Sequence, residues 1–356
     1  MPNQSDKQSK NIPVTIVNVA IAIIHYKDKY LLGFRDALQH QGNRYEFVGG
    51  KIDTNETAQQ ALIREVAEET GIEISDNTIV KLGRLHHDYG DKQVSLQVYN
   101  IELTTQQYEK YKPFSYGLEG QALTWVNKSE LLAGSYNLPA ANKTILEWLH
   151  LPSKIVITYP LAHFSINPDP AAAWLQFHQK HLAEEAWVYI RVKYASSENM
   201  AEQLMRSRPD IFSIMPHNDD CHYLTTSHQI IAYHLTHTAL IQWFNAVENN
   251  SVSGQLLPPS HSLIISCHDA DSIYAANKLA SARLEQQLPP VIGIFLSPVL
   301  ATQTHSNATP LGWEEWSALA VLADMPVIGL GGLSPTLLEQ ATHYGATSIA
   351  GIRQFL

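Results

Sequence analysis

Cysteine, net positive charge and long hydrophobic runs are what this sequence has least of. Only Cys221 and Cys267 occur in 356 residues, and without a C-x-x-C pair neither a disulfide framework nor a thiolate zinc site is expected. The longest early apolar run, residues 19–24, is far too short for a signal segment or a membrane span. We therefore expect a cytoplasmic protein in a reducing compartment, with no membrane partner.

Basic residues are outnumbered, because 24 Lys and Arg stand against 34 Asp and Glu, a formal charge of −10. This balance argues against a surface that binds nucleic acid. Hydrophobic residues make up 45% of the chain and charged residues only 16%, which is typical of folded domains. The length exceeds the roughly 100–200 residues of one domain. Two domains are therefore expected, and nothing in the sequence indicates an oligomeric state.

The first half has the pattern of a mixed α/β domain. The polar start, residues 1–12, predicts a disordered tail. The predicted elements are strands at 15–26, 29–34, 96–102 and 122–126 and helices at 57–70 and about 140–150. Pro152 then interrupts the pattern, which bounds this first domain at residues 13–151.

The second half alternates short apolar runs with amphipathic stretches. The candidate strands are residues 155–159, 187–193, 211–215, 222–226, 263–267, 291–296, 327–330 and 348–352. Strands that alternate with helices predict a parallel sheet, and this many units predict a (β/α)₈ barrel over residues 155–356. The link between residues 222 and 230 is too short for a full crossover helix, so the third crossover is expected to be degenerate.

The segment between residues 49 and 72 is the most informative part of the chain. Thr57 and Gln60 have the spacing of a capping box, and Gly71 is a typical residue after the last turn of a helix. Glu65, Glu68 and Glu69 are then spaced so that they share one helix face.

Three like charges on one face repel one another, and at i,i+4 spacing Arg64 is expected to offset only Glu68. A bound dication would remove the repulsion, and Mg²⁺ prefers oxygen ligands and bridges to phosphates. The alternative from these three glutamates alone is an acidic face in contact with solvent.

The residues around these glutamates decide between the two interpretations. They match the Nudix box, G-x5-E-x7-R-E-U-x-E-E-x-G-U, through Gly50, Glu56, Arg64, Glu65, Val66, Glu68, Glu69, Gly71 and Ile72. The segment therefore resembles the Nudix hydrolases, which cleave nucleoside diphosphates linked to another group. The resemblance implies an α/β/α sandwich with a mixed sheet and Mg²⁺ as cofactor, with Mn²⁺ as a possible substitute. It further implies metal ligands at Gly49, Gly50, Glu65, Glu68 and Glu69, with Glu65 a candidate base and Arg64 orienting the carboxylates.

Residues 15–150 are similar to the MutT branch of that family, which hydrolyses oxidised guanine nucleotides such as 8-oxo-dGTP. The positions that carry this likeness are Arg35, His40, Glu46, Phe47, Glu119 in the segment GLEGQ, and Asn142 in LPAAN, whereas Val48 replaces the usual proline. The likeness implies a phosphate contact for Arg35, an extra metal ligand at Glu119, and substrate contacts at His40, Glu46, Phe47, Val48, Gly49 and Asn142. It implies attack of water on the β-phosphorus, which releases the monophosphate and pyrophosphate for nucleotide-pool sanitation and DNA repair.

Several of these residues have simpler alternatives. The Asn142 amide offers a donor and an acceptor, which suits the edge of 8-oxoguanine, but asparagine is also a common helix N-cap. Phe47 on residue type alone is a core residue, and Arg35 and His40 are compatible with an ordinary surface. Tyr89 lies in a loop that either covers a nucleotide or simply turns.

Residues 155–356 resemble the thiamine phosphate synthase and TenI barrels in the pieces SCH, LSPVLATQTH, VIGLGGL and IAGIR. Phosphate binding is implied for Gly331 and Gly332 after a strand, although glycines there also suit a tight turn. Arg191 and Lys193 lie on one side of a strand and face either an anion or solvent.

The barrel departs from this family because His305 stands where its diphosphate clamp has a lysine, and the usual aspartates are missing. We expect binding of a thiamine- or thiazole-related phosphate, or a non-catalytic module, ahead of synthase activity. A second hypothesis for the whole chain is a role in thiamine metabolism, in which the first domain removes thiamine-related diphosphates and the barrel makes thiamine phosphate.

Overall fold

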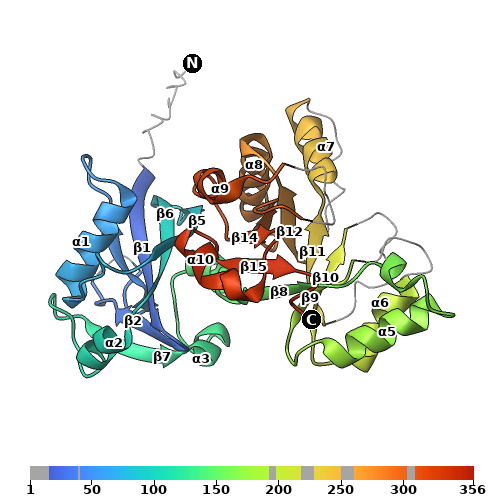
Figure 1. Cartoon of the computed structure of the whole chain (residues 1–356). Coiled ribbons are helices and arrows are strands. Elements are labelled where there is room, and N and C mark those ends of the chain that lie inside the picture. Colours follow the sequence, from blue (N-terminus) through green and yellow to red (C-terminus); the bar gives the residue numbers. More distant parts are fainter. Residues whose placement is uncertain (1–15, 39–40, 192–197, 218–227, 250–259, 303–308) are drawn as a thin grey trace, which may run out of the picture.

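Two sheets with different strand pairing divide the chain in this computed structural model (Figure 1). The structure describes residues 16–38, 41–191, 198–217, 228–249, 260–302 and 309–356. The predicted tail at 1–12 lies outside these residues. Within them, no helix is long and apolar enough to cross a membrane.

The first sheet is mixed, as expected, and has seven strands. Strand β1 is antiparallel to β2 and β4 and parallel to β6. The strands are β1 (Ile16–Tyr26), β2 (Lys29–Phe34), β3 (Tyr45–Glu46), β4 (Val48–Lys51), β5 (Ile79–Asp88), β6 (Gln93–Glu102) and β7 (Ala122–Asn127). The helices are α1 (Ala58–Thr70), α2 (Thr105–Tyr111), α3 (Lys128–Leu132) and α4 (Asn142–Leu149).

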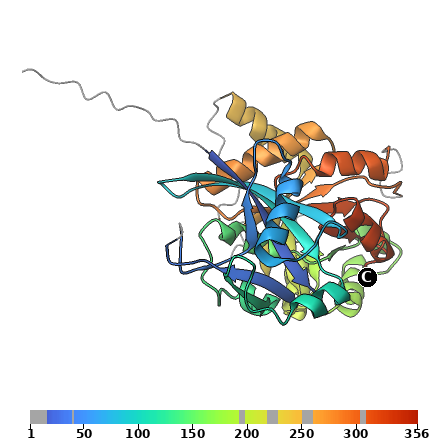
Figure 2. The same cartoon turned by 90° about the vertical axis from the view of Figure 1, so that its left-hand side faces the viewer.

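Alternating side chains of β1 fill two separate cores, one on each face of this sheet. Ala22 and Ile24 pack with Leu62 and Val66 of α1 in the smaller core, and α1 covers this face in Figure 2. Ile23 belongs to the larger core on the opposite face, which continues into the second half of the chain. The sheet is therefore covered by α1 on one side and by α4 and the second domain on the other.

The second sheet is a closed barrel of eight parallel strands in the order β10-β11-β12-β13-β14-β15-β8-β9, which confirms the predicted architecture. The strands are β8 (Lys154–Ile157), β9 (Trp187–Tyr189), β10 (Phe212–Pro216), β11 (Ile230–Leu235), β12 (Ser262–Cys267), β13 (Val291–Leu296), β14 (Val327–Leu330) and β15 (Ser348–Gly351). The helices are η1 (Leu161–Phe164), α5 (Pro170–His181), α6 (Glu198–Ser207), α7 (His237–Glu248), α8 (Ala270–Glu285), α9 (Gly312–Ala320), η5 (Pro335–Leu337) and α10 (Leu338–His343).

The fourth barrel strand differs from the prediction. It is β11, whereas the sequence suggested residues 222–226, which lie mostly within the segment 218–227 outside the described residues. All but one of the residues of β11 are buried, and the Thr236 side chain caps the helix α7 that follows. The third crossover, between β10 and β11, lies mostly outside the described residues, so its predicted degeneracy stays a prediction, whereas a full helix, α7, follows β11.

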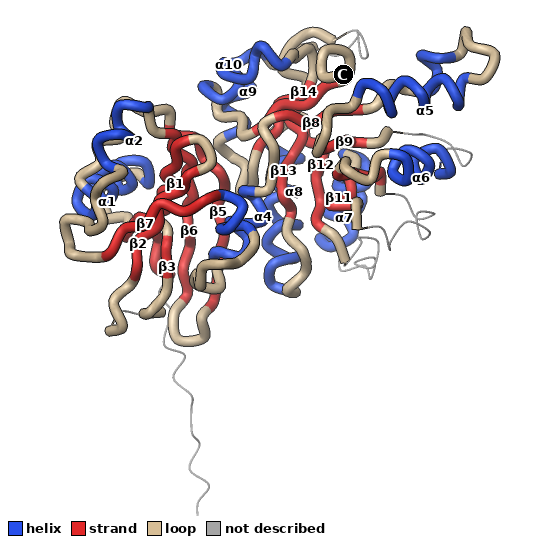
Figure 3. Tube along the Cα trace, turned by 90° about the horizontal axis from the view of Figure 1, so that it is seen from below, coloured by secondary structure: helices blue, strands red, loops and turns tan. Residues whose placement is uncertain are grey.

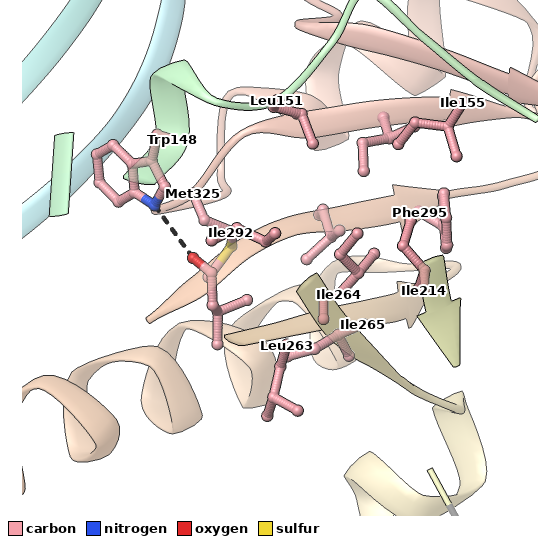
Figure 4. Packing of buried hydrophobic residues seen from close by; sticks show 14 of the residues in the cluster. Trp148, Leu151, Ile155, Ile214, Leu263, Ile264, Ile265, Ile292, Phe295 and Met325 are labelled. Atoms are coloured by element: carbon pink, nitrogen blue, oxygen red, sulfur yellow. Dashed lines mark hydrogen bonds between the residues drawn. The ribbon is translucent and has the colours of Figure 1, made fainter. Parts of the chain in front are cut away.

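The first domain docks on the amino-terminal face of the barrel, with α4 between the mixed sheet and β13 (Figure 3). The buried indole of Trp148 donates from Nε1 to the carbonyl oxygen of Val291 at 3.1 Å (Figure 4). Val291 begins β13. The contact therefore lies opposite the carboxyl ends of the barrel strands, where barrels of this kind place their ligands.

A charged clamp lies beside this tryptophan. Arg84 of β5 donates from Nη2 to Oδ2 of Asp324 at 3.0 Å, and its Nε lies 3.0 Å from Oδ1. The Lys81 ammonium donates to the carbonyl oxygen of Val321 at 2.9 Å. A two-point contact between a guanidinium and a carboxylate fixes direction as well as distance. This clamp therefore holds β5 against the loop that precedes β14.

Gly83 between these residues is a site where a side chain would disrupt the interface. A Cβ there would lie 2.6 Å from the Trp148 ring and 2.9 Å from the Asp324 carbonyl oxygen. We expect Gly83→Ala to lower the free energy of unfolding of the full chain by ~1–3 kcal/mol, since overpacking forces backbone and ring apart. Chemical denaturation measures this change.

Gly33→Ala is the matched control, because a Cβ there would meet no atom closer than 3.9 Å. Its effect should stay within about 0.5 kcal/mol, as at positions without special contacts. Equal free energies of unfolding of the two variants would show that Gly83 is not closely packed at the interface of the two domains.

Candidate active site

The helix α1 has the predicted ends. The Thr57 side chain accepts from the Gln60 amide and the Gln60 side chain accepts from Thr57, while Gly71 closes the helix in the left-handed conformation. These caps fix where the helix begins and ends, and so they fix which turn presents Glu65, Glu68 and Glu69.

Arg64 makes more ion pairs than its helical spacing predicted. Its guanidinium donates to Glu65 at 2.8 Å and to Glu68 at 3.1 Å, and it also binds Glu56 at 2.7 Å. The expectation that it offsets only Glu68 was wrong, because the loop before the helix folds back and brings Glu56 to the same guanidinium. Hydrogen bonds from Arg64 lower the pKa of the Glu56 carboxyl.

Gly50 allows the Glu65 carboxylate to approach the backbone of β4. A Cβ on Gly50 would lie 2.2 Å from the carboxyl carbon and 2.3 Å from Oε2. No side chain fits at that distance, so glycine is required at this point of the Nudix-box pattern. The glutamate is thereby held between its arginine and the β4 backbone.

Glu69 is the most perturbed carboxyl of the site. Burial above all, with the negative charges of Glu46 and Glu65 and, more weakly, Glu119, raises its pKa to about 8. A hydrogen bond from the Gly49 backbone acts in the opposite direction. The side chain therefore lies in a cluster of acidic groups that lacks enough positive charge of its own.

The Glu46 side chain joins this cluster from β3. Burial raises the pKa of Glu46, and the Arg35 guanidinium, 2.7 Å away and directly after the neighbouring strand β2, opposes the increase. The arginine expected to contact phosphate thus pairs with a carboxylate of the site. Glu46 was predicted as a substrate contact only, and its place among the acidic residues follows from strand pairing that no sequence spacing reveals.

The segment 117–121 is anchored to the end of α1. The Leu118 amide and the Gln121 side chain both donate to the Glu69 carbonyl oxygen, at 2.8 and 3.1 Å. Glu119 lies between them with an exposed side chain. This anchoring explains how a residue 50 positions further along the chain contributes to the electrostatics of Glu69.

The donor set suits a hard divalent cation, since it consists of carboxylate oxygens with the β4 backbone beside them. The residues that would hold it are Glu65, Glu69 and Glu119, with Glu68 and the Gly49 and Gly50 backbone at the rim. Within the described residues no three such side chains are already arranged as a closed metal site. Their mutual repulsion, seen in the raised pKa of Glu69, is the kind that a cation relieves.

The residues predicted to contact the nucleobase differ in where they lie. Phe47 and Val48 are each only 2% exposed and lie in the larger and the smaller core, respectively. His40 lies outside the described residues. Asn142 is the first residue of α4, and the N-cap position before it is occupied by Ala141.

Tyr89 lies between the start of α4, where Asn142 is found, and Arg35, the residue predicted to contact phosphate. Burial raises the pKa of the Tyr89 phenol, and a hydrogen bond with the Ala141 backbone and the charge of Arg35 oppose the increase. Tyr89 thus lies near both the start of α4 and Arg35. The loop prediction for Tyr89 corresponds to the hairpin turn between β5 and β6, closed by its amide on the Lys92 carbonyl at 2.9 Å.

The barrel contains a polar group that sequence patterns missed. Tyr189, His234 and Ser266 come from three strands and form a chain, with His234 Nδ1 2.8 Å from the Tyr189 hydroxyl and Nε2 2.8 Å from Ser266 Oγ. Burial, with a smaller contribution from the charge of Arg191, lowers the pKa of His234 to about 3. This imidazole is therefore neutral, and Arg191 acts close to it near the carboxyl ends of the strands.

The predicted phosphate glycines have tight surroundings. A Cβ on Gly331 would lie 2.8 Å from Pro298, and one on Gly332 would lie 2.6 Å from the Ala301 carbonyl oxygen. The Leu300 amide donates to the Gly331 carbonyl at 3.0 Å. Close packing of two loops is thus one reason for these glycines. Lys193 lies outside the described residues, as do residues 303–308, which include His305 at the position of the family's diphosphate clamp.

Comparisons with known proteins relate the two halves to two families. Residues 19–148 match the family described as NUDIX domain. The 8-oxo-dGTP diphosphatase of Escherichia coli (strain K12) is 28% identical over 131 residues, which is 36% of this chain and 93% of that protein. The CTP pyrophosphohydrolase of the same organism is 33% identical over 132 residues, 37% of this chain and 90% of that protein.

Residues 250–355 match the family described as Thiamine monophosphate synthase. A putative thiamine-phosphate synthase 2 of Aquifex aeolicus (strain VF5) is 31% identical over 83 residues, which cover 23% of this chain and 44% of that relative. The match to the family begins after the fourth barrel strand, so the part of the barrel that carries Arg191 and His234 lies outside it.

The acidic cluster predicts a cation-binding defect for Glu69→Gln. Removing one carboxylate charge should weaken Mn²⁺ binding to the full chain by about tenfold or more, because hard cations depend on ligand charge. Titration calorimetry with Mn²⁺ alone measures the affinity.

Glu73→Gln serves as the control. The substitution removes the same charge, but Glu73 is exposed and lies just beyond the helix. It should bind Mn²⁺ as the unchanged chain does. If both variants bound equally, the cation would be held elsewhere.

Proposed function

Through residues 19–148 the chain belongs to the Nudix family of hydrolases, and on this premise we propose that the domain hydrolyses 8-oxo-dGTP to its monophosphate and pyrophosphate with Mg²⁺. This reaction removes oxidised nucleotides from the pool and so protects DNA from mutation. The observation that carries the proposal is the half-buried acidic cluster around Glu69, continuous through Glu46 and Arg35 with the neighbourhood of Asn142.

The residues divide the reaction between them. Mg²⁺ neutralises phosphate charge when it is bound and lowers the pKa of its water. Glu65 receives a hydrogen bond from Arg64 through Oε1, which leaves Oε2 to accept the proton of the attacking water. Arg35 exchanges Glu46 for a phosphate oxygen, since a guanidinium binds either group in the same two-point geometry.

Base recognition is assigned to Asn142. It is not the N-cap residue of α4, which is Ala141, and it is only 6% exposed. A buried amide that binds the O6 and N7–H edge of 8-oxoguanine would leave an unmatched hydrogen-bonding group when dGTP binds instead, because N7 of dGTP carries no proton. Discrimination between the two nucleotides then follows from one hydrogen bond.

The proposal predicts a clear preference for the oxidised nucleotide. The full chain with Mg²⁺ should release pyrophosphate from 8-oxo-dGTP with a kcat/KM at least about tenfold above that for dGTP, the size expected for an unmatched buried polar group. CTP is measured in the same assay, because one relative is a CTP pyrophosphohydrolase.

Asn142→Ala separates base recognition from hydrolysis. It should reduce the ratio of the two kcat/KM values toward one while the rate on dGTP changes little. Equal rates on 8-oxo-dGTP and dGTP in the unchanged chain, or faster hydrolysis of CTP, would reject 8-oxo-dGTP as the substrate. An unchanged ratio in the variant would reject Asn142 as the reader of the base.

For the C-terminal TenI-like barrel we propose binding of a thiamine- or thiazole-related phosphate. Arg191 is the half-buried cation near the neutral Tyr189–His234–Ser266 chain, and it supports an anionic ligand near the carboxyl ends of the strands. His305 stands where the family's diphosphate clamp has a lysine, so we propose binding without synthesis.

Thermal unfolding tests the barrel proposal. Thiamine phosphate at 100 times its dissociation constant should stabilise the chain by about 2.7 kcal/mol and raise its Tm by a few degrees. Arg191→Gln should lose most of this shift, whereas Arg206→Gln, which changes an exposed barrel arginine, should keep it. If neither thiamine phosphate nor thiazole phosphate raised the Tm, both compounds would be rejected as ligands of the barrel.

A further inference from the structure

We propose that the barrel acts as a positioning element for substrate selection in the first domain. Trp148 and Asp324 hold α4 and β5 against the barrel, and in this way they fix where α4 presents Asn142. The inference rests on the proposed function, because it requires Asn142 to read the base. It assigns the barrel a role that needs no ligand in the barrel itself.

The helix α4 connects the base-reading residue to the barrel directly. Asn142 is its first residue and Trp148 its seventh, so the two are only about 9 Å apart along the axis. Ile145 and Leu149 face the core and are buried, and the amino-terminal end has no side-chain cap. The position of this end therefore depends on packing, on the bond from the Asn142 amide to the Pro139 carbonyl oxygen, on the contact of Tyr89 with Ala141, and on the bond from Trp148 to Val291.

The strand β5 supports the other side of the same helix. A register irregularity lies between Lys81 and Gly83, and the Trp148 ring lies against the glycine so closely that a Cβ would not fit. The next residue donates its amide to the Asp324 carbonyl oxygen at 3.2 Å and its guanidinium to the Asp324 carboxylate. Helix, strand and barrel loop thus meet at a single glycine.

The barrel loop that receives these contacts is itself fixed. Asn277 of α8 donates to the Leu322 carbonyl oxygen at 2.9 Å, and its Oδ1 accepts from the Asp324 amide at 2.9 Å. The loop is therefore bound to a 16-residue helix of the barrel. A platform of this kind transmits its position to α4 because packed elements do not deform continuously.

The acidic cluster has a different support. Its helix α1 packs on the opposite face of the sheet, in the smaller core, which contains no residue of the barrel. Loosening the barrel contact should therefore move Asn142 without moving Glu65 or Glu69. A misplacement of about 1 Å is enough to lose a hydrogen bond that discriminates two substrates, so selectivity should fall while hydrolysis continues.

The test uses two conservative variants of the full chain. Trp148→Phe keeps an aromatic ring and removes the N–H donor, and Asp324→Asn keeps the shape and removes the charge. Each should lower the ratio of kcat/KM for 8-oxo-dGTP over dGTP by about fivefold, the size of one weakened neutral hydrogen bond. The kcat for dGTP should stay within about twofold.

A double-mutant cycle with Asn142→Ala shows whether the tryptophan acts through the asparagine. In the Asn142→Ala background Trp148→Phe should change the ratio no further, because the group being positioned is absent. Additive losses, or an unchanged ratio in both single variants, would overturn the inference. Asp210→Asn is the control, since it breaks an Arg–Asp pair within the barrel, between Arg208 and Asp210, and should leave the ratio unaffected.

Amide hydrogen exchange gives a readout that does not depend on the substrate. Exchange over residues 142–149 should accelerate in Trp148→Phe and Asp324→Asn and not in Asp210→Asn. Unchanged exchange would contradict the positioning role even if the nucleotide specificity is as proposed. Faster exchange in a chain that shows no preference for 8-oxo-dGTP would instead reject the proposed substrate while retaining the barrel as the support of α4.

Discussion

The repulsion among carboxylates on a partly buried helix face is the constraint on which the active-site half of this protein depends. Glu69 is surrounded by Glu46, Glu65 and Glu119, and burial raises the pKa of Glu69 to about 8. Arg64 supplies positive charge to three other carboxylates and not to this one. The fold therefore holds together a site whose charge is unbalanced until a cation joins it, and this imbalance is what makes the site suited to phosphate chemistry.

Holding such a cluster requires rigid surroundings, and the glycines show where these are tightest. Gly50 lets the Glu65 carboxylate lie against β4, and Gly83 lets the Trp148 ring lie against β5. The first contact lies in the acidic cluster of the candidate active site, and the second lies at the interface of the two domains. Both are close approaches that any side chain would prevent, although only the first lies in a recognisable motif.

The docking geometry is compatible with both of the proposed ligand sites in one chain. The first domain covers the amino-terminal face of the barrel, around Val291 and Asp324. The polar chain of Tyr189, His234 and Ser266 lies toward the carboxyl ends of the strands. The barrel mouth is therefore left for a ligand of its own, while the opposite face supports the neighbouring domain.

The sequence alone determined the carboxylate helix, its caps and its family, because these depend on residues close together in the chain and on helical spacing. It also determined the two fold classes, since the alternation of strands and helices is local. It misplaced the fourth barrel strand, because the apolar run at 222–226 was taken for the strand that lies at 230–235. It also limited Arg64 to one partner, because the return of Glu56 depends on a folded loop. Only the tertiary structure decided that Glu46 joins Glu69, that Tyr189 meets His234, and that Trp148 rests on the barrel. Each of these contacts joins residues far apart in sequence, and only strand pairing and domain docking bring them together.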